Sequence, residues 1–97
     1  MTAGAQTPMR RKFDRDVMNN ARALDVSSAS LLILNTLQDE QPEVQIMGAA
    51  AVFLELAEFL KVPAQDVFTA TKNLINDLDG KRVEFRAVRA YLEGELN

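Results

Sequence analysis

The longest apolar pattern in the chain runs from Glu43 to Leu60, with the sequence EVQIMGAAAVFLELAEFL. Its only polar residues are Glu43, Gln45, Glu55 and Glu58. A helix with one solvent-facing side has an apolar stripe of about 100°, whereas this segment is apolar or small on nearly every side. We therefore predict a buried central helix over about 43–60, covered by other helices of the chain or by a second copy.

Each proline precedes a segment with helical periodicity, which suits a residue that has a fixed φ and no amide hydrogen. Pro8 is predicted to open a helix over about 7–24, and Pro42 opens the central helix. Pro63 is predicted to open a further helix that ends near Leu78.

The segment before the central helix is less clear. Its leucines recur at helical spacing, at Leu31, Leu34 and Leu37. Ser27 or Ser28 would serve as the N-cap of a helix here. The apolar run is short and contains a β-branched residue, so periodicity alone does not decide whether residues 28–38 form a helix or a strand. The lack of a partner strand elsewhere in the sequence favours a helix.

Gly80 is predicted to end the helix that Pro63 opens, because glycine readily takes positive φ. A last helix is predicted from about Arg82 to Leu96, with an inward side made of Phe85, Val88, Leu92 and Leu96. Residues 1–6 show no pattern and are predicted to be disordered. The fold class is therefore all-α: one helical domain over 7–97, built as a compact bundle or orthogonal array of four to five short helices around the central helix.

Composition narrows the functional classes. The 97 residues are 47% hydrophobic and 26% charged, as in an ordinary globular domain, and the net charge is −3. The chain has no cysteine and no histidine, which excludes disulfides, thiolate nucleophiles, serine–histidine pairs and structural zinc sites. We expect no metal and no cofactor. The negative charge weakly disfavours nucleic acid and anionic membranes as partners.

The N-terminal basic cluster is not followed by an apolar stretch, so it does not resemble a secretory signal. The central helix carries two glutamates near its end and fits a membrane span poorly. We expect a cytoplasmic protein.

One side of the central helix combines small and acidic residues. Val44, Gly48, Ala51, Glu55 and Glu58 follow one another at spacings of 4, 3, 4 and 3. Small residues allow another backbone to approach, and a glycine costs about 1 kcal/mol against alanine inside a helix, which suggests that Gly48 has a packing role. We predict a helix contact between subunits along this line, which we call the small-residue seam. The more ordinary alternative is a contact with a helix of the same chain.

A row of arginines lies on one side of the last helix, at Arg82, Arg86 and Arg89. Guanidinium groups bind carboxylates and phosphates through two parallel hydrogen bonds, so this basic face could bind an acidic partner. The alternative is a solvated helix face on which Arg89 pairs with Glu93, because such exposed charge rows are usually solvent-facing.

The segment over about 53–74 resembles a helix-turn-helix motif, with Ala57 inside its first helix, a turn at Lys61 and Val67 in its second helix. It departs from the motif because Lys61 occupies a turn position often taken by glycine, and because Asp66 would face phosphates. The nucleic-acid contacts implied by this resemblance are Arg10, Arg11, Lys12, Gln65, Thr69 and Lys72.

Two chemical sites were tested against their required spacing. Asp77 to Gly80 echoes part of a calcium loop, but the loop would then begin at Ile75 and place Arg86 at the bidentate position, where it cannot bind a cation. No carboxylate has an evident catalytic partner, and Glu55 or Glu58 would need a concave pocket to act as a general base. We expect no enzyme.

These patterns predict a small non-enzymatic helical protein–protein interaction or adaptor module that self-associates, as a homodimer, and also binds another protein. The alternative is a helix-turn-helix-like DNA-binding regulator that uses residues 53–74.

Overall fold

The computed structural model describes residues 12–95, which form five helices and a small hairpin. In chain order these are α1 (Arg15–Asn19), α2 (Ala23–Leu37), α3 (Pro42–Phe59), α4 (Ala64–Ile75), β2 (Asn76–Asp77), β3 (Gly80–Lys81) and α5 (Val83–Glu95). The predicted all-α class is confirmed. The predicted disorder of residues 1–6 and the helix start at Pro8 lie outside the described residues.

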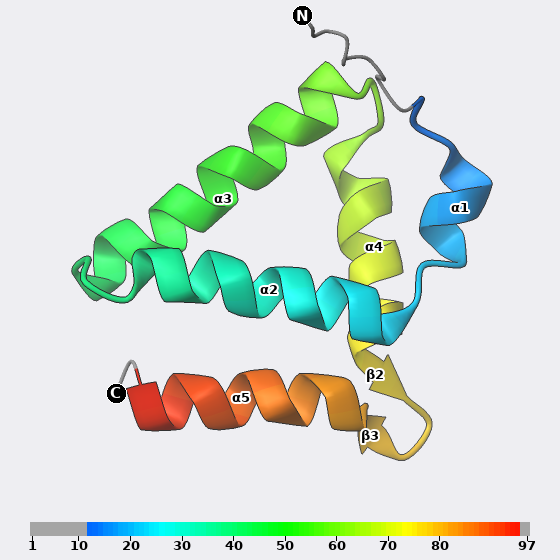
Figure 1. Ribbon diagram of the computed structural model, residues 1–97. Helices are drawn as coiled ribbons and strands as arrows, with labels where there is room; N and C mark the ends of the chain where they lie inside the picture. The colour runs from blue at the N-terminus through cyan, green and yellow to red at the C-terminus, as the bar shows by residue number, and fades with distance from the viewer. Residues whose placement is uncertain (1–11, 96–97) are drawn as a thin grey trace, which may run out of the picture.

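Helices α2, α3 and α4 form the three sides of a triangle (Figure 1). Helix α5 lies alongside α2 and runs in the same direction, while α1 lies beside α4. The molecule is flat, with extents of 42 × 34 × 22 Å. Each helix therefore has its neighbours mainly within one plane.

The predicted helix over 7–24 is wrong in its described part, because the chain leaves the helix after Asn19. Asp14 caps the start of α1 by accepting hydrogen bonds from the amides of Asp16 and Val17. The Asn20 side chain donates to the Asp16 carbonyl at 2.8 Å. Asparagine competes in this way for backbone groups and is therefore a poor residue for a helix interior.

Helix α2 begins at Ala23, so the predicted N-caps Ser27 and Ser28 are wrong. Arg22 donates two hydrogen bonds to Asp25, of 3.1 and 3.2 Å, and this pairing raises the pKa of Arg22. Asp25 also lies in the first turn, where a negative charge complements the helix dipole. Ser27 is buried inside the helix, and its hydroxyl donates to the Leu24 carbonyl at 3.1 Å. Residues 28–37 are helical, as the sequence favoured.

The bounds of α3 agree with the predicted central helix to within one residue, and Pro42 occupies its first turn. Its predicted burial is wrong within one chain, because Ala57 is the only residue of α3 that is buried. Helix α3 packs on α2 near its start, where Gln45 donates to the Leu37 carbonyl at 3.0 Å. It meets α4 at its end. The broad sides of the flat triangle leave the rest of α3 uncovered.

Helix α4 ends at Ile75, three residues before the predicted end at Leu78. The chain turns instead into an antiparallel hairpin that pairs Asn76 with Lys81 and Asp77 with Gly80. The Asp77 carboxylate accepts the Asp79 amide at 2.9 Å, which stabilises the turn. Gly80 adopts a φ of 114°, so its positive φ serves the hairpin and not the helix end that was predicted.

The core is small and divided between two places, the α3–α4 turn and the start of α5. The buried hydrophobic residues of the described chain are Ala57, Val62 and Phe85. Phe85 confirms the predicted inward side of the last helix. Farther along α5, the Tyr91 hydroxyl lies 3.1 Å from Oε1 of Gln38 and 3.3 Å from Oδ1 of Asn35, which holds the second half of α5 against α2.

Candidate protein-interaction site

The exposed apolar residues of α3 fall on two opposite sides of the helix. One side, which we call the Met47 flank, consists of Ile46, Met47, Ala50 and Leu54. The other, the Phe59 flank, consists of Val52, Leu56 and Phe59. At 100° per residue their centres are roughly 170° apart. Ile46, Met47 and Phe59 have exposed fractions of 71%, 69% and 69%, so neither flank is covered within the chain.

The Phe59 flank continues onto α2 as an apolar groove of about 440 Å³. The groove is lined by Ile33, Thr36, Leu37, Gly48, Ala49, Val52, Phe53 and Leu56. Its one hydroxyl, on Thr36, already donates to the Leu32 carbonyl at 3.1 Å. A shallower hollow adjoins it and shares Val52 and Leu56 with it, ending at Phe59. The groove therefore presents apolar surface with no free polar donor from a side chain.

The small-residue seam is divided in the structure. Gly48 faces its own chain, because a Cβ built on it would lie 3.8 Å from Cδ2 of Leu37. Val44 and Ala51 are exposed, together with Glu55 and Glu58. The ordinary alternative, contact within the chain, thus describes Gly48. The exposed flanks on either side of the seam were missed, although the all-round apolar pattern was itself the signal for them.

The three arginines of the predicted basic face bind acceptors of their own chain. Nε of Arg82 donates to the Leu74 carbonyl at 2.7 Å. The backbone amide of Arg82 donates to the Ile75 carbonyl at 2.8 Å. Nε of Arg86 donates to the Lys81 carbonyl at 3.0 Å. Arg82 is half-buried and joins the end of α4 to the start of α5. Arg86 is exposed, and its remaining N–H groups face solvent.

Arg89, the third of the row, pairs with Glu93 at 3.1 Å as the solvated alternative expected. Both side chains are more than half exposed. A pair of this kind contributes only about 0.3–0.5 kcal/mol to helix stability.

The α3–α4 turn contains Lys61, the residue that departs from glycine in the helix-turn-helix resemblance. Lys61 adopts a φ of 60°, the left-handed conformation for which glycine is commonly used. The next residue, Val62, is buried and its amide donates to the Ala57 carbonyl at 3.0 Å. Asp66 is paired with Arg15 at 2.6 Å, so its charge is partly compensated.

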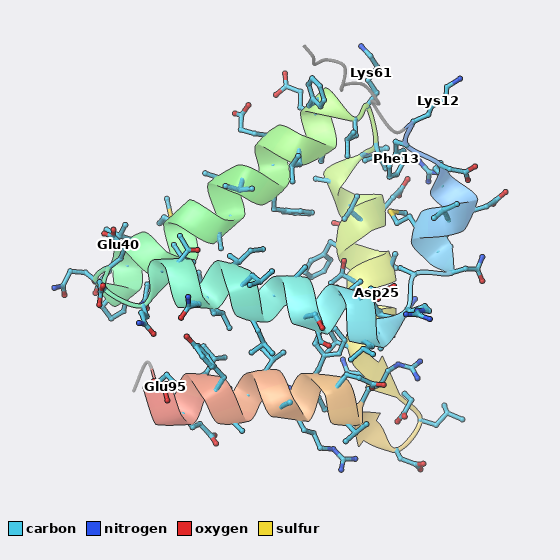
Figure 2. The ribbon with its side chains drawn as sticks, in the orientation of Figure 1. Lys12, Phe13, Asp25, Glu40, Lys61 and Glu95 are labelled. Atoms are coloured by element: carbon cyan, nitrogen blue, oxygen red, sulfur yellow. The ribbon has the colours of Figure 1, made fainter. Side chains whose placement is uncertain are left out.

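The outer side of α4 carries the remaining candidate contacts to nucleic acid. Gln65, Thr69 and Lys72 are exposed, and Gln65 donates to the Thr69 hydroxyl at 3.3 Å. The Lys72 amine lies 5.5 Å from the ring centroid of Phe68. Figure 2 shows Lys12 and Lys61 extending from the edge of the molecule where the α3–α4 turn lies. Arg10 and Arg11 lie outside the described residues.

Between residues 12 and 95, no three acidic side chains lie close enough to one another to hold a metal ion. Within the same residues, no helix has both the length and the apolar character needed to cross a membrane. Glu55 borders the shallow hollow beside Phe59, and Glu58 is exposed.

Comparison with models of known protein families found no match for this chain. Comparisons with curated proteins and with solved structures likewise found no significant match.

Proposed function

We propose that this chain is a non-enzymatic helical protein–protein interaction module that self-associates and binds partners through the apolar sides of α3. The observation that supports this proposal is a pair of exposed apolar patches on α3, one containing Ile46 and Met47 and the other continuing from Phe59 into the groove. Single exposed apolar residues are common on protein surfaces, but contiguous apolar patches mark interaction sites. Covering each of these side chains would contribute on the order of 1–2 kcal/mol.

The groove between α2 and α3 suits an amphipathic helix of a partner. Such helices insert apolar side chains spaced three or four residues apart, and the groove offers aliphatic walls with space for them. Helix α3 carries no lysine or arginine, while Glu55 and Glu58 lie beside the apolar surface. A partner helix with basic residues at its edges would therefore be electrostatically complementary.

The test of this function is a capture experiment with a matched pair of variants. Phe59→Glu places a charge on the Phe59 flank, whereas Leu78→Glu places one at the exposed hairpin tip. We expect wild type and Leu78→Glu to retain a defined protein partner, and Phe59→Glu to lose it. If wild type captures no protein and light scattering gives the mass of one chain at every concentration, the proposed function is wrong.

A second candidate function is binding of duplex DNA through α4, and the left-handed backbone of Lys61 favours it. This conformation supplies the tight turn that a helix-turn-helix needs, and the ion pair of Asp66 with Arg15 reduces repulsion of phosphates. Exposed Gln65, Thr69 and Lys72 would face the DNA.

This candidate predicts binding to random DNA duplex that weakens as the salt concentration rises. Binding releases cations from the phosphates, and this release becomes less favourable when the salt concentration is high. Lys72→Ala should weaken the binding, whereas Arg89→Ala on α5 removes the same charge elsewhere and should not. Absence of binding at low salt, or binding that salt leaves unchanged, would eliminate DNA as the ligand.

A further inference from the structure

We infer that two copies of the chain pair through their Met47 flanks, with the two α3 helices antiparallel and a two-fold axis beside Ala50. This inference rests on the proposed function and identifies one partner of α3 as a second copy. It leaves the Phe59 flank and its groove free for another protein.

Ile46, Ala50 and Leu54 of the Met47 flank are spaced evenly about Ala50, which allows self-pairing, whereas the counterpart of Met47 is Phe53, which lines the groove. In an antiparallel pair related by a two-fold axis, residues equally far before and after the central residue face each other. Ile46 and Leu54 lie four residues on either side of Ala50, so each would pack against the other in the second copy. A foreign helix would require no such symmetry.

The centre of the flank is small while its ends are large. Ala50 occupies the middle of the flank, and a short side chain at a crossing point lets two helix axes approach to about 8 Å. At this separation Ile46, Met47 and Leu54 can reach the opposite helix. These three residues have exposed fractions of 71%, 69% and 54%, so they are available to a partner.

Charge favours the antiparallel over the parallel arrangement. Glu43 lies on the same side of α3 as the Met47 flank, so a parallel pair would place two Glu43 carboxylates together. Glu40 and Lys61 lie at opposite ends of α3 (Figure 2). An antiparallel pair about Ala50 brings Lys61 of one copy beside Glu40 of the other. The opposite charges at each end then attract one another.

The exposed area of the Met47 flank sets the expected affinity of the dimer. Ile46, Met47 and Leu54 together expose on the order of 400 Å², about half of the roughly 800 Å² that each partner buries in a standard interface. An interface of this size lies in the range of weak, transient contacts. We therefore expect a dimer whose dissociation constant lies in the micromolar range, and a mass that changes with concentration.

The first test measures mass by sedimentation equilibrium or light scattering. Leu54→Glu places a carboxylate opposite Ile46 of the second copy. We therefore expect the dissociation constant of the dimer to be at least tenfold higher than in wild type. Val44→Glu makes the same kind of change about 100° around the same helix, on the small-residue seam, and should leave the dimer intact. Circular dichroism of both variants checks that α3 remains folded.

The second test uses the absence of cysteine in the natural chain. Ala50→Cys would place two thiols beside the two-fold axis, where dissolved oxygen with a copper catalyst should join them as an intermolecular disulfide. Ala51→Cys points about 100° away around the helix and should cross-link far more slowly.

These results separate the inference from the function on which it rests. If wild type dimerises but Leu54→Glu leaves its mass unchanged and Ala50→Cys does not cross-link, the Met47 flank is not the dimer interface, although self-association stands. If wild type keeps the mass of one chain into the high micromolar range, the inference that a second copy is the partner is wrong. A protein captured by that single chain would still support the proposed function.

Discussion

Gly48 is a glycine inside a helix that does not require one. It lies against Leu37 of its own chain, and a Cβ at this position would meet Cδ2 of Leu37 at 3.8 Å, an ordinary van der Waals distance. The space is therefore sufficient for alanine. The cost of glycine here is conformational, because its backbone loses more freedom than that of alanine when a helix forms.

We expect Gly48→Ala to raise the free energy of unfolding by about 1 kcal/mol, measured by urea denaturation. Gly94→Ala is the matched control, since a Cβ there meets nothing within 4 Å and the residue lies near the end of α5. The increase in the free energy of unfolding should be smaller for Gly94→Ala, because helix ends fray. A loss of stability in Gly48→Ala would show that close approach to α2 is the reason for the glycine.

Lys61 illustrates a residue whose backbone is determined by its neighbours. A left-handed conformation costs a side chain other than glycine about 1–2 kcal/mol, yet Lys61 adopts it. The burial of Ala57 and Val62 on either side offsets that cost, because any other turn would expose them. The residue type alone indicated a departure from a glycine-like turn, whereas the backbone of Lys61 adopts the conformation for which glycine is commonly used.

At the scale of elements, α5 is held to the fold mainly by its packing on α2. Phe85 is its buried residue, Tyr91 contacts the second half of α2, and Arg82 ties its start to the end of α4. With so few buried side chains in the described chain, each one carries a large share of the stability.

We expect Phe85→Ala to lower the free energy of unfolding by about 3–5 kcal/mol, because a large buried ring is lost and a cavity remains. Phe68→Ala serves as a control: Phe68 is half exposed on α4, so the same truncation there should cost much less. Urea denaturation followed by circular dichroism measures both. Equal losses in the two variants would contradict the assignment of Phe85 to the core.

At the scale of the whole molecule, the flat shape explains why α3 is exposed. Neighbours within the plane of the triangle cover only one edge of α3, while the two broad sides of the molecule have no further layer. A domain normally packs two layers of secondary structure around its core, and a second copy placed on one broad side would provide the missing layer.

This arrangement predicts that the melting temperature rises with protein concentration. Association with a second copy stabilises only the folded chain, so mass action increases the apparent stability as the concentration increases. Melting curves recorded by circular dichroism across a wide range of concentrations measure the effect. Leu54→Glu should abolish the dependence, and a melting temperature of wild type that does not change with concentration would count against the dimer.

The sequence by itself determined that the protein is helical, because apolar periodicity and the positions of proline act through local backbone preferences. It also predicted the bounds of α3 and the position of Phe85 on the inward side of the last helix. It did not place the break at Asn20 or the hairpin after Ile75, where single side chains compete for backbone groups. Only the tertiary structure decided which sides of α3 are covered, because burial depends on how other helices are arranged around a helix and not on its own pattern.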